Sequence, residues 1–546
     1  MEESTIDHRD PSFWAPGTLT LEDLQAANTK VLLHPVPTSD PNDPLNWASW
    51  RKALNYGLVC FYVLMTFVEL DIGFTAWEDY EIELGFSVDL LNGAAATNYA
   101  GLAIGCIFFV PLVNKYGRRP MYLFSTALQL ASVIWFAKTE TRGDLIGSNL
   151  ISGLGGAISE TIVQMTIADL FFVHNHAAMN AYYMLATSIG AFLGPVASGY
   201  VVVSQGWRWM FWWCTIFFAI NLVALIFLFE ETKYVSVLVG HNGAKQRPVQ
   251  ENPRGGSIEQ PNPGDSKPAE LGSAVEPTRL ESHLHVDPTI RMKTFWERLP
   301  LITKTDGSIL HDIYQPIVVL FTFPAIAYTA MTYGSLLAWF ATMTSVQATY
   351  LFYPPYNFSA AGVGLMNVAP FVGVIPGTFV GGYLNDKSIL WLSKRNSGIY
   401  EPEMRLWLAL VGALITPAGI LMFGVGLAHS AAWPVLAVGY GLFGFGFSMV
   451  GDIALSYAMD CYQNIIGNAL VGVVFTRNIF SVIILFALTP WINGMGVQNV
   501  HVLIAVLCFA LSMLPVPLLI WGKKARIATA TRYRKMASQQ PTHRDI

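Results

Sequence analysis

Twelve long apolar stretches, separated by polar segments, constrain this chain more than any other feature of its sequence. Each has about the 20 residues that a helix needs to cross the hydrocarbon core of a bilayer. Six of them precede a polar interval at 233–313, and six follow it. The stretches lie at 52–74, 93–113, 121–138, 145–172, 179–203 and 208–229, and then at 314–341, 359–381, 404–426, 433–458, 466–490 and 500–522.

This layout predicts an all-α integral membrane protein with twelve transmembrane helices in two six-helix halves. Proteins built from two similar membrane halves carry a small-molecule site at the interface of the halves, near the bilayer midplane. We therefore expect transport rather than catalysis. The expected organisation is a cytosolic N-terminal segment at 1–51, a first six-helix half at 52–232, a cytosolic central linker at 233–313, a second six-helix half at 314–522 and a basic cytosolic tail at 523–546.

Composition agrees with a membrane protein and argues against several other classes. The chain is 53% hydrophobic and 13% charged, whereas a soluble domain carries about 25% charged residues. The formal net charge of −5 is small, and no basic domain suggests a nucleic acid partner. The five cysteines show neither metal-ligand spacing nor a disulfide framework. No nucleophile-and-base pattern or phosphate loop is visible, so we expect no enzymatic activity, no metal and no cofactor.

Lys and Arg collect in alternate loops, and this pattern predicts the orientation of the chain. They cluster before the first stretch, between the second and third, between the eighth and ninth, and after the twelfth. The segment 75–92 instead holds five Asp or Glu and no Lys or Arg. Because cytosolic loops are enriched in Lys and Arg, both termini are expected in the cytosol. The single Asn-x-Ser/Thr sequon, at Asn357, then lies in an outer loop and is a candidate glycosylation site.

The loop between the second and third stretches reads Leu-Val-Asn-Lys-Tyr-Gly-Arg-Arg-Pro over 112–120. Gly117 suits a tight turn with positive φ, and the cations Arg118 and Arg119 can bind helix ends and acidic groups. The corresponding loop of the second half contains Asp386. The alternative is that any cytosolic loop collects Lys and Arg. A charged loop repeated at the same place in each half favours a role in conformational switching instead.

These loops together resemble the loop signature of the major facilitator superfamily, Gly-x-Leu-x-Asp-Arg-x-Gly-Arg-Arg. The first copy departs from the signature, because Val110 replaces its first Gly and Asn114 replaces its Asp. The second copy keeps Gly382, Leu384 and Asp386 but lacks the Gly-Arg-Arg end.

The fifth stretch resembles a second motif, the Gly-x-x-x-Gly-Pro-x-x-Gly-Gly of proton-coupled antiporters. The matching residues are Gly190, Gly194, Pro195 and Gly199, with Ser198 in place of one Gly. Small residues at a spacing of four let helices approach closely, and a proline kinks the span. A small-residue packing face is physically the same feature, so only the resemblance connects it to antiport.

Segments at 42–52, 231–234 and 395–406 are similar to the fungal twelve-span drug:proton antiporter group of that superfamily. The resemblance implies the major facilitator fold in a multi-pass protein of the plasma membrane. It implies proton-coupled efflux of drug-like or secondary-metabolite small molecules by alternating access. The expected partners are a small-molecule substrate, protons and membrane lipids, and we expect a monomer. A proton-coupled importer of a small organic cation or nutrient, and a non-transporting membrane sensor, stay open as alternatives.

Polar residues within the stretches are candidates for the site, because a charge at mid-span costs about 2.5–3.5 kcal/mol to insert. In the fourth stretch Asn149, Glu160 and Gln164 share one helical face with two glycines. Glu160 lies about halfway through, where a carboxylate could carry a proton or bind an organic cation. Asn149 stands where the family often has an Arg, so that position is not expected to serve the usual proton relay.

Four further polar residues complete the candidate site. Asp452 and Arg477, in the tenth and eleventh stretches, could form a buried pair that offsets the cost of burying each charge. Alternatively, both residues bind substrate or take part in proton coupling directly. Glu69 lies near the outer end of the first stretch and belongs either to a cavity or to the acidic outer loop. Asn98, in the second stretch, is a weaker cavity candidate.

The predicted orientation can be tested by proteolysis. Because the Lys and Arg pattern places both termini and residues 235–313 in the cytosol, a protease added to intact cells should leave the central linker uncut. The same protease should cut it in permeabilised cells. Prompt cleavage of the linker in intact cells would reverse the assignment.

Overall fold

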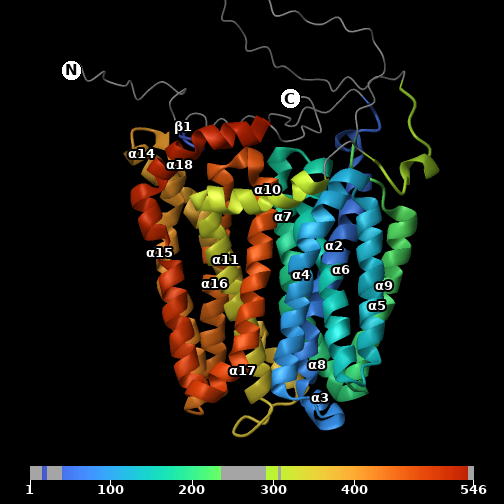
Figure 1. Cartoon of the computed structure of the whole chain (residues 1–546), viewed down its shortest axis with the longest axis vertical. Coiled ribbons are helices and arrows are strands. Elements are labelled where there is room, and N and C mark those ends of the chain that lie inside the picture. Colours follow the sequence, from blue (N-terminus) through green and yellow to red (C-terminus); the bar gives the residue numbers. More distant parts are fainter. Residues whose placement is uncertain (1–14, 21–39, 235–289, 305–308, 539–546) are drawn as a thin grey trace, which may run out of the picture.

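The computed structural model describes residues 15–20, 40–234, 290–304 and 309–538. The chain forms two bundles of near-parallel helices side by side, the first blue to green and the second yellow to red in Figure 1. Most of the predicted central linker and parts of both terminal segments lie outside the described residues.

The first bundle contains the helices that match the first six apolar stretches. The fifth of them is interrupted by a π-helical turn at Ile189–Leu193. A short outer segment, Gly73–Ala76 followed by α3 (Trp77–Leu84), continues from the first helix. The long helices are α2 (Ser49–Ile72), α4 (Val88–Tyr116), α5 (Arg119–Ala137), α6 (Arg142–Leu170), α7 (Val173–Ser188) with α8 (Gly194–Gln205), and α9 (Trp207–Leu228).

The second bundle repeats this pattern with a second π-helical turn, at Val380–Leu384. Its helices are α10 (Ile309–Thr322), α11 (Pro324–Tyr350), α12 (Ala360–Met366), α13 (Val368–Phe379), α14 (Asn385–Arg395), α15 (Leu406–Ala428), α16 (Trp433–Cys461), α17 (Ile466–Ser512) and α18 (Pro515–Ser538). Single 3-10 turns lie at Pro44–Asn46, Trp296–Arg298, Pro402–Arg405 and Gln463–Ile465.

A two-stranded sheet lies at the end of the bundle opposite α3. The strand β1 (Leu19–Thr20) pairs antiparallel with β2 (Ile399–Tyr400), with Leu19 opposite Tyr400. The described segment 15–20 is therefore attached to the second half, although the first half follows it in sequence.

Among the described residues, ten helices are long and apolar enough to cross a membrane, and one bent pair would be an eleventh. The last of the ten, Ala469–Ala537, contains nearly all of the eleventh predicted stretch and all of the twelfth. Gly496, at φ 78°, breaks the helical backbone between them.

The seventh predicted stretch, 314–341, is not one straight span. Its start lies in α10, which meets α11 at an angle of 96°. Phe323 is extended (φ −110°, ψ 109°), as expected for the residue before Pro324, because the proline ring disfavours the helical conformation there. The helix that runs along the bundle is Pro324–Tyr350.

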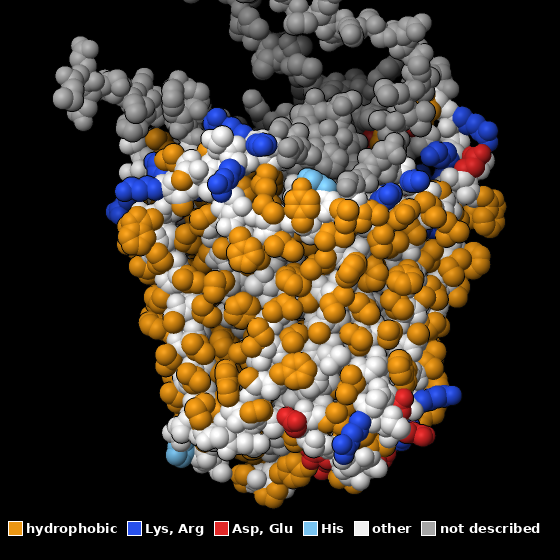
Figure 2. All heavy atoms as spheres, in the orientation of Figure 1, with side chains coloured by type: hydrophobic (Ala, Val, Ile, Leu, Met, Phe, Trp, Pro, Cys, Tyr) orange, Lys and Arg blue, Asp and Glu red, His pale blue; other side chains and the backbone are white. Residues whose placement is uncertain are grey.

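The surface carries the pattern of a membrane protein. Figure 2 shows a wide apolar belt, with Lys and Arg gathered at the end near the termini and most Asp and Glu at the opposite end. This is the asymmetry from which the orientation was predicted. Following that prediction, we call the end that carries α3 the outer end and the other the cytosolic end.

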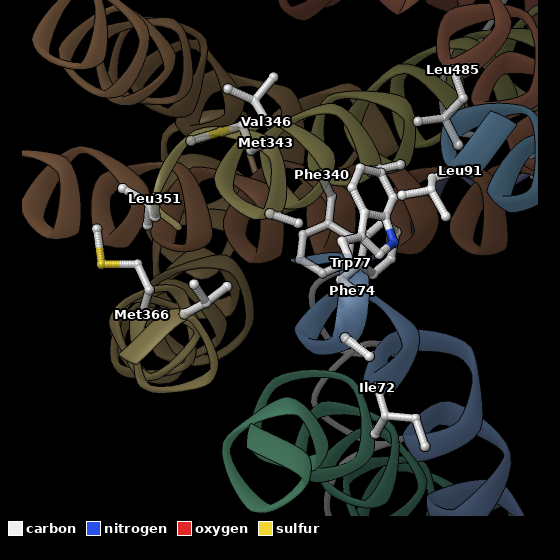
Figure 3. Close-up of a cluster of buried hydrophobic side chains, with 14 of the residues drawn as sticks. Ile72, Phe74, Trp77, Leu91, Phe340, Met343, Val346, Leu351, Met366 and Leu485 are labelled. Carbon is white, nitrogen blue, oxygen red and sulfur yellow. The ribbon is translucent and has the colours of Figure 1, made fainter. Parts of the chain in front are cut away.

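The two halves meet in an apolar cluster at the outer end. In Figure 3, Phe74 and Trp77 from the segment after α2 lie against Phe340 from α11. All three side chains are at most 7% exposed. Polar contacts add to this closure: Asn92 Nδ2 in α4 donates to Thr489 Oγ1 in α17 at 3.0 Å, and Ser345 Oγ in α11 donates to Asn92 Oδ1. The described conformation is therefore closed at the outer end.

Small residues let the fifth and eighth spans pack tightly in this closure. An ideal Cβ built on Gly199 in α8 would lie 2.5 Å from the Ala360 carbonyl oxygen and 2.9 Å from Ala361 Cα in α12. Both contacts are with backbone, which cannot rotate away. The glycine of the antiporter-like motif thus permits direct backbone contact between the halves.

Substituting Gly199 should therefore weaken the outer closure. We expect Gly199→Ala to push α8 and α12 apart and expose residues of the apolar cluster. The measurement is labelling of Leu91→Cys, whose position is 2% exposed, by a membrane-impermeant thiol reagent added from outside. Labelling should rise several-fold in the Gly199→Ala background.

Gly93→Ala is the matched control, because its Cβ would meet only Phe486 in the other half at an ordinary 3.6 Å. Equal labelling of Leu91→Cys in the Gly199→Ala and Gly93→Ala backgrounds would show that this contact does not hold the outer end shut.

Candidate transport site

A cavity of about 160 Å³ lies between the two halves. Helices α2, α4, α6 and α7 wall it on the first side and α11, α13, α16 and α17 on the second. Its wall combines aromatic rings with a few ionisable groups, as ligand sites commonly do. The aromatic residues are Phe67, Tyr99, Tyr183, Phe192, Tyr333, Phe340 and Phe447, and the ionisable ones are Asp71, Glu160, Asp452 and Arg477.

An ion pair joins the two halves across this cavity. The carboxylate of Glu160 in α6 accepts a hydrogen bond from Nη2 of Arg477 in α17, and its second oxygen accepts one from Asn478 Nδ2 at 3.0 Å. The two charged side chains are only 4% and 10% exposed. The guanidinium also lies 5.3 Å from the ring centroid of Tyr333, within range of a cation–π interaction.

The predicted pairing of Asp452 with Arg477 is wrong. Arg477 bonds to Glu160 of the other half instead, and Asp452 accepts a hydrogen bond from Ser448 one turn earlier, at 3.3 Å. The reason is the packing of α17, which lies against α4 and α11 and touches α16 only slightly. Asp452 still lines the central cavity.

The cavity carries an excess of negative charge. Three carboxyl groups, Asp71, Glu160 and Asp452, face one guanidinium, that of Arg477. Asp71 is 5% exposed and makes no ion pair or hydrogen bond with another described residue. Asp71 therefore lies inside the bundle and not in the acidic outer loop.

Three predicted site residues lie together in a second, smaller cavity of about 60 Å³ nearer the outer end. Glu69, Asn98 and Asn149 line it. Ser132 Oγ donates to Glu69, Asn98 Nδ2 donates to Ser152 Oγ at 3.2 Å, and Asn149 Nδ2 donates to the Leu145 carbonyl at 2.8 Å. Each of the three therefore has a partner in the first half.

Only thin partitions separate the two cavities, since the side chains of Leu70 and Tyr99 line both. Gln164, one turn beyond Glu160, lines neither of them. Tyr99 and Phe447 were not predicted, because an aromatic residue in an apolar span has no periodicity that separates a cavity wall from lipid.

At the cytosolic end, Gly117 has the positive φ that the motif predicted, at 108°. The turn brings the amides of Arg118 and Arg119 to the carboxylate of Glu231, at 2.9 and 3.1 Å. Burial raises the pKa of Glu231, and its bonds to these amides and to the amide of Lys233 partly offset that effect. Arg118 Nε also pairs with Asp169 at the end of α6, at 2.9 Å.

Asn114 stands where the family signature has Asp, and this difference changes the hydrogen bonding of the loop. Asn114 Nδ2 donates to Asp312 in α10 at 3.3 Å, a bond that an ionised Asp at this position could not make. In the second half, Asp386 binds Arg405 Nη1 at 2.9 Å, and Arg405 also pairs with Asp460 at the end of α16. Arg118 in the first half and Arg405 in the second thus each bind an acid at the end of a cavity-lining helix.

The remaining predicted residues lie outside both cavities. Those of the fifth span pack against α2 or follow the π-helical turn, and Asn357 is exposed. Ideal Cβ atoms on Gly190 and Gly194 would meet Leu64 and Val68 of α2, and Pro195 follows the π-helical turn. Asn357 is exposed in the loop between α11 and α12, with φ 46°. Within the described ranges, no group of three His, Cys, Asp or Glu could hold a metal ion.

The turn at Gly117 gives a sharp prediction. A Cβ there would lie 2.9 Å from Cδ of Glu231 and closer to one of its oxygens, and positive φ costs other residues about 1–2 kcal/mol. We expect Gly117→Ala to lower both the melting temperature of the purified protein and its transport rate per correctly localised molecule.

Gly382→Ala is the control, since Gly382 lies in the π-helical turn of the second half and its Cβ would have nothing within 4 Å. If both variants behave like wild type, the contact between the turn and Glu231 is dispensable.

Comparison with known proteins identifies the family. A family model described as Major Facilitator Superfamily matches residues 56–483. An uncharacterized MFS-type transporter of Schizosaccharomyces pombe is 32% identical over 519 residues, covering 92% of this chain and 89% of the relative. Protein HOL1 of Saccharomyces cerevisiae is 29% identical over 571 residues, covering 96% of this chain and 97% of the relative.

A solved structure shares the fold. The human organic anion transporter MFSD10 (TETRAN) superposes with a TM-score of 0.51 at 16% identity, covering 88% of this chain and 99% of that one. At that identity the likeness concerns the fold alone. The match of the family model over most of the chain, the full-length relatives and the two-bundle architecture lead to one conclusion: the chain belongs to the Major Facilitator Superfamily and is a multi-pass membrane transporter.

Proposed function

We propose that this transporter is a proton-coupled exporter of drug-like or secondary-metabolite small molecules, and that it favours organic cations. The observation that carries the proposal is the charge of the central cavity, where three carboxyl groups face one guanidinium. A cation between the aromatic rings would gain both charge neutralisation and cation–π contacts. A cavity with this charge disfavours organic anions.

Glu160 and Arg477 suit the coupling step, because their pair spans the two halves. A proton on Glu160 would neutralise the carboxylate and leave the guanidinium of Arg477 free to move with its half. Loss of that proton would restore the attraction or let a substrate cation compete with Arg477. Proton binding and substrate binding would then be mutually exclusive at one carboxylate, which is the requirement for antiport.

Asp71 and Asp452 fit a role in binding the substrate. Both line the cavity, and neither pairs with a described cation. Each belongs to a different half, so a bound organic cation could bridge the halves as the Glu160–Arg477 pair does. Glu69, beyond the partition of Leu70 and Tyr99, would serve as a relay toward the outer side.

Import of a small organic cation or nutrient is the second candidate function. The same excess of negative charge supports it, since an acidic cavity binds a cation arriving from either side. We further propose that the protein is a monomer in the plasma membrane with both termini in the cytosol. The charge asymmetry of its surface supports this orientation. In this orientation Asn357 faces outside and is accessible for glycosylation.

Glu160→Gln tests the proposal. Purified protein is placed in liposomes with an imposed pH gradient, and a fluorescent organic cation is followed in both directions. Wild type should accumulate the cation against its gradient when protons flow the other way. We expect Glu160→Gln to abolish this accumulation, because the amide cannot release or take up a proton.

Stability must be measured beside transport, because breaking a buried ion pair costs about 3–5 kcal/mol when one charge is left behind. The double variant Glu160→Gln with Arg477→Gln removes both charges and should recover much of the lost stability without recovering coupling. Glu401→Gln is the matched control, since it removes only the exposed pair with Lys523.

The direction of coupled movement separates the two candidate functions, because export opposes the proton flow and import follows it. Concentrative transport by Glu160→Gln at the wild-type level would place the coupling at Asp452, Asp71 or Glu69 instead. An organic anion transported in preference to the cation would refute the assignment of substrate charge.

A further inference from the structure

The described end of the central linker, residues 290–304, presents an apolar surface outside the bundle. Five of its apolar side chains are 46–72% exposed, namely those of Met292, Phe295, Trp296, Leu301 and Ile302. Phe295 and Trp296 contact each other edge to face, with ring centroids 5.5 Å apart. Such a concentration of exposed apolar side chains in a short segment marks an interaction surface.

The same segment is strongly basic. Arg291, Lys293, Arg298 and Lys304 stand against the single acid Glu297, so its formal charge is 4 − 1 = +3. The ion pair between Arg291 and Glu297 is loose, at 3.6 Å, and exposed. Aromatic and basic side chains therefore share one surface.

Backbone contacts hold this segment to the first half. Arg119 Nη1 donates to the Leu299 carbonyl at 2.7 Å, and the Thr303 amide donates to the Tyr116 carbonyl at 2.8 Å. Lys233 Nζ donates to the Thr303 carbonyl at 3.1 Å, and burial lowers the pKa of Lys233 to about 8. Because the bundle binds the backbone, the side chains are left to project away from it.

The attachment places the segment at the border of the apolar belt. Arg119 Nη2 also donates to the Ile226 carbonyl at 2.7 Å, at the cytosolic end of α9. Ile226, Phe227 and Leu228 there are 41–53% exposed and belong to the apolar outer face of the bundle. Figure 2 shows Lys and Arg side chains directly above the apolar belt on this side of the molecule.

Helix α10 extends the surface along the same border. Its side chains Leu310, Tyr314, Ile317 and Phe321 are 42–83% exposed and recur at spacings of four, three and four, which places them on one face. The helix runs across the bundle at 96° to α11 (Figure 1). An amphipathic helix lying across the ends of membrane spans has the geometry of an interfacial helix.

We propose that residues 290–304 and α10 form a leaflet-binding surface that inserts into the cytosolic leaflet and selects anionic phospholipids. Aromatic rings favour the headgroup level of a bilayer, and Lys and Arg near it attract anionic lipid. The continuity of this surface with the apolar belt favours lipid over a soluble protein as its occupant. Since Arg119 of the charged loop holds the segment, bound lipid would act directly on that loop.

The test uses full-length protein in nanodiscs of phosphatidylcholine, alone or mixed with phosphatidylserine. A spin label on Trp296→Cys should collide with oxygen more often than with a water-soluble nickel complex, and more so when phosphatidylserine is present. Lys394→Cys, at an exposed position in α14, provides the water-exposed control. Labelled wild type gives the background, because four of its five cysteines are buried.

Charge dependence is tested with Lys293→Gln combined with Lys304→Gln. Each surface cation lost should weaken the response to phosphatidylserine about fivefold. Lys394→Gln combined with Lys524→Gln removes the same charge from exposed cytosolic positions of the other half and should leave the response unchanged.

A label at residue 296 that stays exposed to the nickel complex in both kinds of nanodisc would overturn the proposal and leave the surface for a protein partner. A label that is buried equally in both kinds would overturn the selection of anionic lipid.

Discussion

The carboxylate of Glu160 and the guanidinium of Arg477, which belong to opposite halves, neutralise each other inside the membrane-spanning region. The association of the two halves depends on this ion pair. Neither Glu160 nor Arg477 has a counter-charge in its own half within hydrogen-bonding distance among the described residues. Each charge alone would cost several kcal/mol to insert at mid-span, so the halves are electrostatically incomplete until they associate. Any rearrangement of the halves must therefore compensate these charges in another way, with a proton, a substrate or water.

The two spans that pack against each other at the outer end each contain a π-helical turn. The fifth span contains the π-helical turn Ile189–Leu193 and the eighth contains Val380–Leu384. On the outer side of these turns α8 and α12 are in direct backbone contact, whereas Ala191 and Phe192 within the first turn line the cavity. π-helical turns are frequent at functional sites. In the second half, Val374 and Thr378 of α13 line the cavity directly before the turn.

The sequence predicted the positions of the spans well, because the thickness of the bilayer fixes how many consecutive apolar residues each span must have. It failed at the start of the seventh span, since the apolar face of α10 looks like transmembrane sequence until Pro324 is read as a break. The Arg118–Asp169 pair was predictable because both residues lie at neighbouring helix ends of one half. The partner of Arg477 was not, because a sequence gives the position of a residue along a helix but not the direction in which that helix faces the other half.

The strand Leu19–Thr20, which precedes the first half in sequence, pairs with Ile399–Tyr400 of the second half. The two halves are therefore not structurally independent segments of the chain. Arg526 reinforces this pairing by donating to the Pro16 carbonyl while it holds Glu403 with its other nitrogens at 2.8 and 2.6 Å. The linker connects the two bundles covalently. A second connection is non-covalent, because β1 precedes the first bundle in sequence but pairs with β2 of the second. If the chain were divided at the linker into two polypeptides, the first would still carry a strand that completes the second. The covalent boundary between the halves and their structural boundary therefore do not coincide.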